Sequence, residues 1–261
     1  MLIAQRQSRL EQLLAHRGMC DLETLSAELR VSQSTIRRDI DSLEQKGVVK
    51  RTHGGVIWVG EPSNGSRPFA FDQRMGYQLD AKRQIAAAAK SLISPGETII
   101  LDGGTTTFYL AQELLDIPLQ LVTNSLPIAN LFLNDEHVEL ILTGGLLYPR
   151  YGVLLGPQTE SALESMHTKT LFFSVAGIHD GVLYNQNSLL VESELKMMAH
   201  AQNIILLADS SKLGQQALAR LSYLKDVHTV VTDGAIAAEH REQIRGAGCE
   251  LLIAEAASAA V

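Results

Sequence analysis

The chain has 261 residues, of which 46% are hydrophobic, and a formal net charge of −7. Its two cysteines, Cys20 and Cys249, lie far apart without CxxC spacing, which argues against a disulfide framework or a zinc site. Because no apolar run reaches the roughly 18 residues of a membrane span and the N-terminus lacks an apolar leader, we expect a soluble, cytoplasmic protein.

The charge is unevenly distributed along the chain. Residues 1–58 contain nine Lys/Arg and seven Asp/Glu, whereas residues 59–261 contain thirteen and twenty-two. Opposite net charges in two parts of one chain indicate two different kinds of partner.

The first 58 residues have the pattern of three helices followed by a β-hairpin. Leucines at helical spacing define two runs, and Ser32 precedes a third run with Ile36, Ile40 and Leu43 on one face. Gly47 is expected to end that third helix, and His53-Gly54-Gly55 lies between two short β-prone segments. The leucines of the first two runs are Leu10, Leu13, Leu14, Leu22, Leu25 and Leu29. This order predicts a winged helix-turn-helix domain over residues 1–58, mainly α with a β wing.

The rest of the chain alternates between strands and helices. Residues 59–76 are rich in Gly, Pro and Ser and are interpreted as a linker, residues 77–254 as one domain, and residues 255–261 as a disordered tail. Near-continuous Val/Ile/Leu runs are typical of parallel strands that are covered on both faces. The expected strands are 98–101, 119–122, 138–142, 170–175, 203–207, 228–231 and 250–253. Strand–helix alternation predicts an α/β fold with a parallel sheet.

The third helix of the first domain carries side chains suited to DNA. Gln33 can pair with adenine and Arg37 or Arg38 with guanine in the major groove, while neighbouring hydroxyl groups bind phosphates. Asp39 is not expected to contact DNA; it is expected either to orient the two neighbouring arginines or to pair inside the domain. The predicted DNA-binding residues are Ser32, Gln33, Ser34, Thr35, Arg37 and Arg38 of the helix and Lys50, Arg51 and His53 of the wing.

These residues also carry a family resemblance. The segment Val31–Ile40, VSQSTIRRDI, with Arg51 and His53-Gly54-Gly55 downstream, resembles the DNA-binding signature of the DeoR family of bacterial transcription regulators. The resemblance extends over roughly residues 5–234. It implies a regulator of sugar catabolism, more often a repressor, whose second domain is similar in fold to ribose-5-phosphate isomerase and binds a phosphorylated sugar.

Independently of the resemblance, polar and glycine-rich segments follow several of the expected strands. In an open α/β sheet, ligands bind at the carboxyl ends of the strands, near the point where the strand order reverses. Glycines let the backbone approach an anion, and a helix N-terminus offers N–H donors and a favourable dipole. The predicted effector-binding residues from these segments are Asp102, Gly103, Gly104, Thr105, Thr106, Thr107, Thr123, Asn124, Ser125, Gly144, Gly145 and Gly177, with Lys196 or Lys212 as a cation.

The resemblance implies two further features of this site. Glu192 and Lys196 match family positions, although their i, i+4 spacing also fits a plain surface ion pair. Gly103 departs from the family, which more often has a small side chain at this position. The sequence leaves two consequences open, namely a change in the flexibility of the loop or room for the ligand.

Several other functions are disfavoured. No GxGxxG or GxxxxGK[ST] motif is present, so no nucleotide cofactor is expected, and the histidines lack metal-ligand spacing, so no metal is expected. Carboxylates such as Asp102, Asp180 and Glu192 leave open a phosphosugar isomerase fused to a DNA-binding domain. We favour a sensor without enzymatic activity that binds operator DNA as a homo-oligomer, a dimer or a tetramer.

Overall fold

The computed structural model describes residues 6–7, 9–10, 13–14, 19–29, 31–45, 48–52, 55–58 and 71–255. The chain divides into two compact units, Met1–Leu79 and Asp80–Val261. Among the described residues, none of the helices combines the length and the hydropathy that a membrane span requires.

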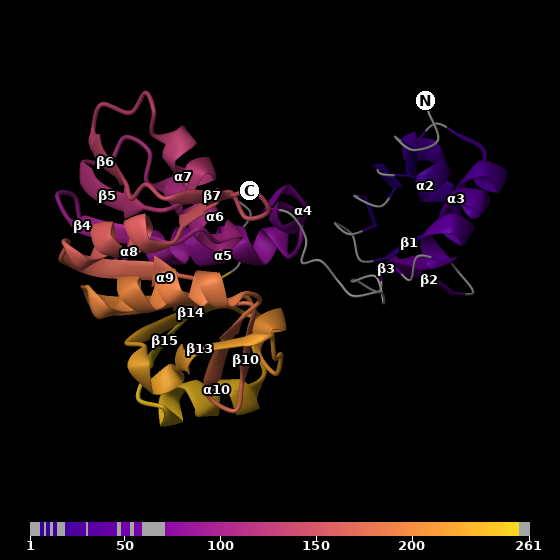
Figure 1. Cartoon of the computed structure of the whole chain (residues 1–261). Helices are drawn as coiled ribbons and strands as arrows, with labels where there is room; N and C mark the ends of the chain where they lie inside the picture. The colour runs from indigo at the N-terminus through magenta and orange to yellow at the C-terminus, as the bar shows by residue number, and fades with distance from the viewer. Residues whose placement is uncertain are drawn as a thin grey trace, which may run out of the picture. The chain divides into compact units, whose positions relative to one another are not determined.

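The first unit combines helices with a small antiparallel sheet, drawn in indigo in Figure 1. The described residues between positions 6 and 14 are helical, and helices α2 (Leu22–Leu29) and α3 (Gln33–Gln45) follow. Strands β2 (Val49–Thr52) and β3 (Gly55–Trp58) form the predicted hairpin, and β1 (Met19–Cys20) adds to it in the order β1-β3-β2. The predicted winged helix-turn-helix fold is confirmed. Strand β1 was not expected, because two residues are too few to show an alternating pattern.

The leucine and isoleucine pattern of the sequence forms the core of this unit. Leu10, Leu14, Leu25, Ile36 and Leu43 are fully buried, and Leu29 and Ile40 are nearly so. The hairpin adds Val49 and Val56 to the same cluster. Positions Gly47, His53 and Gly54, to which the sequence assigned a helix end and the tip of the wing, lie outside the described residues.

The second unit contains a seven-stranded sheet in which all strands are parallel (Figure 1). The strands of the sheet are β4 (Thr98–Leu101), β5 (Leu119–Thr123), β6 (Val138–Leu142), β9 (Thr168–Phe173), β12 (Ala201–Leu207), β14 (Thr229–Asp233) and β15 (Glu250–Ala254). Each lies within two residues of its predicted position. Residues 99–101 of β4 and all of β14 are buried without alternation, as expected for strands covered on both faces.

Helices precede the first strand of this sheet and connect most of the others. They are α5 (Leu79–Lys90), α6 (Thr105–Glu113), α7 (Leu126–Leu131), α8 (Pro157–Glu164), α9 (Ser188–Ala199) and α10 (Ala238–Gly246). The strand order is β15-β14-β12-β9-β4-β5-β6. From β4 the chain therefore adds strands first on one side and then, from β9 onward, on the other. The topological switch point lies between β4 and β9, and it is there that open α/β sheets bind ligands.

Two smaller sheets were not predicted. Strands β7 (Leu146–Tyr148) and β8 (Val153–Leu155) form a hairpin, and β10 (Gly177–His179), β11 (Val182–Asn185) and β13 (Ala219–Tyr223) form an antiparallel sheet. Their strands are three to five residues long, which is too short to show a strand periodicity, although β8 is entirely apolar. One signal was available: Asp180-Gly181, with φ of 48° and 73°, joins β10 and β11 as a two-residue Asp-Gly turn. Asp180 is therefore a turn residue, which explains its presence without a catalytic role.

The segment interpreted as a linker is partly helical. Helix α4 spans Phe71–Met75, whereas residues 59–70 lie outside the described residues. Residues 256–261 of the expected tail also lie outside them.

Candidate functional site

Helix α3 begins with a cap built from its own hydroxyl groups. Ser32 Oγ accepts a hydrogen bond from the N–H of Thr35 at 3.3 Å and lies 2.9 Å from the hydroxyls of both Ser34 and Thr35. Such a cap satisfies one of the N–H groups that a helix start leaves without a partner. Ser32, Ser34 and Thr35, which are predicted to contact phosphates, therefore also determine where α3 starts.

The exposed face of α3 presents Gln33, Arg37 and Arg38 to solvent, opposite the buried Ile36 and Ile40. These are the side chains to which the sequence assigned base recognition. Their exposure is compatible with base recognition. That role stays a prediction, because arginine is also commonly exposed on helices that do not bind DNA.

Asp39 is buried and points into the domain. Its carboxylate accepts hydrogen bonds from Arg6 at 2.5 Å and from Gln7 at 3.2 Å. The expectation that this aspartate pairs inside the domain is confirmed. The pair joins α3 to the helical residues at the start of the chain.

Arg51 of strand β2 contacts α3. Its guanidinium forms an ion pair with Asp41, lies 3.7 Å from Glu44 and donates a hydrogen bond to the carbonyl oxygen of Arg37 at 2.8 Å. These contacts hold strand β2 of the wing against helix α3. Lys50 lies in the same strand, while His53 lies outside the described residues.

In the second unit, Asp102 organises the loop after β4. One carboxylate oxygen accepts hydrogen bonds from the N–H of Gly104 at 2.9 Å and the hydroxyl of Thr107 at 2.8 Å. The other accepts from the N–H of Ser174, just after β9, at 2.9 Å. Asp102 thus bridges the two strands that flank the switch point.

The loop leads directly into the N-terminus of α6. The N–H groups of Thr105, Thr106 and Thr107 lie in the first turn of α6 and therefore have no acceptor within the helix. The cap residue, Gly104, has no side chain that could accept from them. All three threonines are buried or nearly so. Free N–H groups and the helix dipole at a switch point form an arrangement that favours a negatively charged ligand group.

Gly103 and Gly104 are required by close packing. A Cβ atom on Gly103 would lie 2.0 Å from Val153 Cγ1 of β8, and one on Gly104 would lie 2.0 Å from the hydroxyl of Ser174. The absence of a side chain at position 103 therefore makes room for the hairpin β7–β8, which answers the question that the sequence left open.

The loop after β5 uses most of its polar atoms internally. The Thr123 hydroxyl donates to the carbonyl of Leu101 at 2.7 Å and accepts from the N–H of Ser125, while Ser125 caps α7. Asn124 donates to the carbonyl of Leu154 at 3.1 Å, but its Oδ1 is buried without a hydrogen-bond partner. Among the three predicted residues, Asn124 is the one with a buried acceptor atom that has no hydrogen-bond partner in the described part of the chain.

The remaining glycines have structural explanations. Gly144 and Gly145 adopt φ of 72° and 120° in the turn into β7, and the carbonyl of Gly144 accepts a hydrogen bond from Thr159 at 2.6 Å. Gly177 lies in β10, where a Cβ atom would be 2.3 Å from the carbonyl oxygen of Gln215.

The two predicted charged residues of α9 do not pair with one another in the structure. Lys196 forms an ion pair with Glu164 of α8. This hydrogen bond raises the pKa of Lys196 and lowers that of Glu164. Glu192 is exposed. Lys212 lies in a short 3-10 helix (Ser210–Lys212) after β12.

Asp209 caps that 3-10 helix and keeps one oxygen unused. Its Oδ1 accepts from the N–H of Ser211 at 3.2 Å, whereas Oδ2 is buried without a hydrogen-bond partner. Together with Asn124, it places a second unpartnered acceptor at the carboxyl end of a strand.

The sequence did not single out Glu194. This residue lies on α9 and is 7% exposed, and its Oε1 accepts a hydrogen bond from Asn185 at 2.6 Å. Burial, together with the nearby negative charge of Asp102, raises the pKa of Glu194 well above its ordinary value. The two acidic positions Glu192 and Glu194 look alike in the sequence, and only burial distinguishes them.

The raised pKa gives a testable pH dependence. Because the pKa of Glu194 is raised in the folded protein, the folded state binds this proton more tightly than the unfolded chain, so Glu194 costs stability as pH rises above about 4.5. Relative to Glu194→Gln, the wild-type protein should lose up to about 1.4 kcal/mol of unfolding free energy per pH unit. Urea unfolding between pH 5 and 8 measures this difference. Parallel pH profiles for the two proteins would contradict a buried, protonated Glu194.

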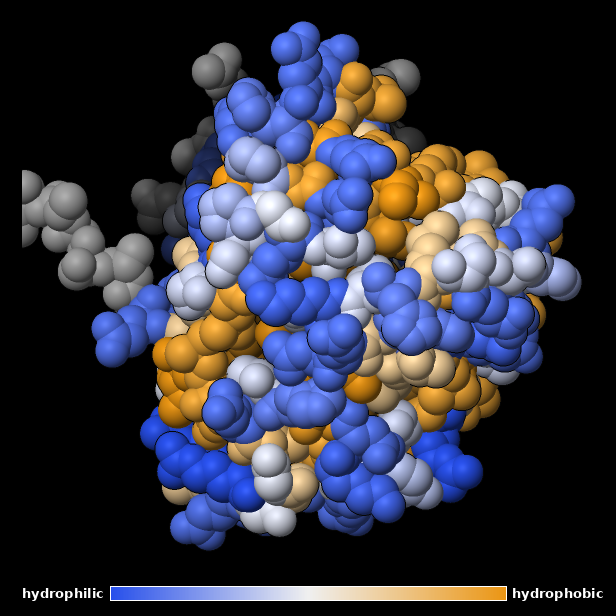
Figure 2. Space-filling view, turned by 90° about the vertical axis from the view of Figure 1, so that its left-hand side faces the viewer, coloured by the Kyte–Doolittle hydropathy of each residue, from blue (hydrophilic) through white to orange (hydrophobic). Residues whose placement is uncertain are grey.

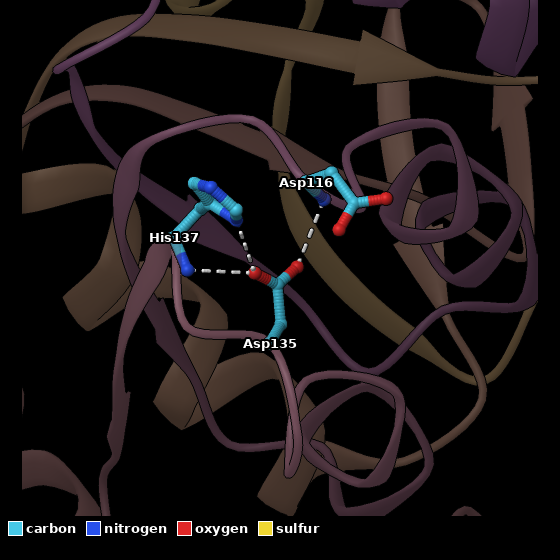
Figure 3. Close-up of side chains that lie close together, drawn as sticks. All are labelled: Asp116, Asp135 and His137. Carbon is cyan, nitrogen blue, oxygen red and sulfur yellow. Dashed lines mark hydrogen bonds and ion pairs between the residues drawn. The ribbon is translucent and has the colours of Figure 1, made fainter.

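One cluster has the composition of a metal site. Asp116, Asp135 and His137 bring possible ligand atoms within 4.8 Å of one another (Figure 3). The Asp135 carboxylate, however, accepts hydrogen bonds from the N–H groups of Asp116 and His137, each at 2.9 Å. These hydrogen bonds join two loops and explain why the three side chains lie together, so the cluster gives no reason to assign a metal.

Comparison with known proteins identifies both units. Residues 6–61 match the model of the DeoR-like helix-turn-helix domain, and residues 77–234 match that of the DeoR C-terminal sensor domain. Solved structures with similarity include ribose-5-phosphate isomerase A from Methanocaldococcus jannaschii, with 18% identity, a TM-score of 0.39, and coverage of 52% of this chain and 54% of that one.

Curated relatives are similar over nearly their full length. The chain is 32% identical to the uncharacterized HTH-type transcriptional regulator YulB of Bacillus subtilis over 90% of this chain and 91% of that protein. It is 34% identical to the HTH-type transcriptional regulator GlpR of Haloferax volcanii, covering 95% and 96%. It is 31% identical to UlaR of Shigella dysenteriae, covering 95% and 98%. With both domain models matched in order, this chain belongs to the DeoR family of helix-turn-helix transcriptional regulators.

Proposed function

We propose that this protein represses a sugar-catabolic operon and that a phosphorylated sugar, bound by the sensor domain, releases it from operator DNA. The observation that carries the proposal is the N-terminus of α6, which directs unpartnered N–H groups toward the switch point of the sheet. The Asp102 loop holds that helix start between β4 and β9.

Repression requires two states of the protein. The effector shifts the equilibrium only if it binds the state with low operator affinity more tightly. A dimer or tetramer would place two α3 helices on half-sites about one helical turn, or a multiple of it, apart. Exposed apolar side chains of the sensor domain, such as Leu133, Leu146 and Leu218, support assembly, and hydrophobic surface forms several patches on the face drawn in Figure 2.

The anion site is tested by the Thr105→Val and Thr106→Val double substitution. Valine conserves volume and removes two hydroxyl donors at the helix start, so the rise in Tm caused by a cognate sugar phosphate should vanish. Operator binding without effector should be unchanged. Differential scanning fluorimetry over a panel of pentose and hexose phosphates, with gel-shift assays, measures both quantities.

Thr107→Val is the matched control for this experiment. Its hydroxyl donates to buried oxygens of the Asp102 loop, so its loss should lower Tm even without ligand. Loss of operator binding in the double variant would indicate misfolding instead. The same sugar phosphates, incubated with the wild-type protein, should be recovered unchanged, whereas interconversion would show an isomerase.

A further inference from the structure

Glu194 lies on the face of α9 that contacts the effector-site loops. Leu190, four residues earlier and so on the same helix face, packs in one cluster with Val153 and Leu155 of β8. Val153 is the side chain for which Gly103 leaves room. The Glu194 carboxyl group is also close enough to Asp102 for their charges to interact. The packing of Leu190 on β8 and the interaction with Asp102 therefore both place Glu194 near the loop that leads into α6.

Within the part of the chain that the structure describes, only one of the two carboxyl oxygens of Glu194 has a hydrogen-bond partner. Oε1 holds Asn185 at the end of β11, whereas Oε2 is buried and has no hydrogen-bond partner among the described residues. A buried polar atom without a partner destabilises the folded protein, because it has lost its hydrogen bond to water. A purely structural role would be met by a glutamine or an apolar residue at lower cost, so the unpartnered atom points to a ligand.

The surroundings of Asp102 and Glu194 affect the negative charge of the two carboxyl groups in opposite ways. Asp102 accepts hydrogen bonds from two N–H groups and a hydroxyl, which stabilise its negative charge, whereas burial and the charge of Asp102 raise the pKa of Glu194 and so favour its neutral form. A neutral carboxyl group donates one hydrogen bond and accepts others. A ligand hydroxyl has the same dual capacity, whereas a phosphate group needs donors, which α6 supplies.

We propose that Glu194 is a specificity-determining residue of the sensor site, which hydrogen-bonds through Oε2 to a hydroxyl group on the carbon chain of the effector. The inference rests on the proposed function, since it requires a polyhydroxylated ligand whose anionic group lies at the α6 N-terminus. In this arrangement Glu194 binds a hydroxyl group of the sugar, and the N-terminus of α6 binds the phosphate.

The test compares two ligand classes on three proteins. Isothermal titration calorimetry measures inorganic phosphate and a panel of aldose and ketose phosphates against the wild type, Glu194→Gln and Glu194→Met. Methionine conserves length and removes both hydrogen-bonding oxygens, so affinity for the best sugar phosphate should fall about tenfold or more. Affinity for inorganic phosphate should stay within twofold. Glutamine, neutral and able to donate and accept, should retain most of the sugar-phosphate affinity.

Glu242→Gln on α10 is the control for loss of an acidic side chain, because Glu242 is exposed. Undiminished sugar-phosphate affinity in Glu194→Met would overturn the inference. So would an equal loss for inorganic phosphate and sugar phosphate, which would indicate that Glu194 only supports the fold. A wild-type protein that binds no member of the panel would instead overturn the proposed function itself.

Discussion

Gly103→Ala should destabilise the sensor domain by about 1–3 kcal/mol, the usual cost of overpacking a filled core. The new Cβ atom would lie 2.0 Å from Val153 Cγ1, so either the loop after β4 or the hairpin β7–β8 must move. Because the same loop starts α6, stabilisation by sugar phosphate should also weaken. Urea unfolding and ligand-induced Tm shifts measure the two effects.

A second substitution tests the cause. Val153→Ala removes Cγ1, and the next atom in reach is Val153 Cβ at 3.4 Å, an ordinary contact distance. The Gly103→Ala/Val153→Ala double variant should therefore be more stable than the sum of the single effects predicts, with a coupling of about 0.5–3 kcal/mol. Additive effects would show that the Val153 contact is not what makes glycine necessary.

Arg37→Ala should weaken operator binding by about 1–3 kcal/mol if its guanidinium reads a guanine. The preference for that base should relax at one operator position, because phosphate contacts carry no sequence information. Binding-site selection followed by fluorescence anisotropy at fixed salt measures both. Arg37 is suited to this test because its side chain is exposed and its substitution leaves the core of α3 intact.

Arg245→Ala on α10 provides the control for loss of one positive charge, since Arg245 is exposed in the sensor domain. It should leave operator affinity and base preference unchanged. An unaltered selected sequence for Arg37→Ala would remove Arg37 from base recognition. Arg51 is less informative, because its contacts with Asp41 and Glu44 mix recognition with the position of the wing.

The sequence by itself determined the two-domain plan and the strands of the main sheet. Buried parallel strands need continuous apolar runs, and the helices of a small domain need one apolar stripe, so both signals are local. For Asp39 the sequence left two roles open, and the structure decides between them, because its partners are Arg6 and Gln7 rather than the neighbouring Arg37 and Arg38. The short strands β7, β8, β10, β11 and β13 were missed because three to five residues carry too little periodicity.

Only the tertiary structure decided which polar residues remain for a ligand. Thr107, Thr123 and Ser125 match an anion site in sequence. In the structure the hydroxyls of Thr107 and Thr123 donate to Asp102 and to the carbonyl of Leu101, and the hydroxyl of Ser125 caps α7. Asn124 and Glu194 keep buried oxygens without partners. Hydrogen-bond partners and burial depend on segments far apart in the chain, as with Gly103 and Val153 or Asp102 and Ser174. Local residue patterns do not contain that information, and therefore the sequence yields a candidate site but not the atoms that remain free to bind a ligand there.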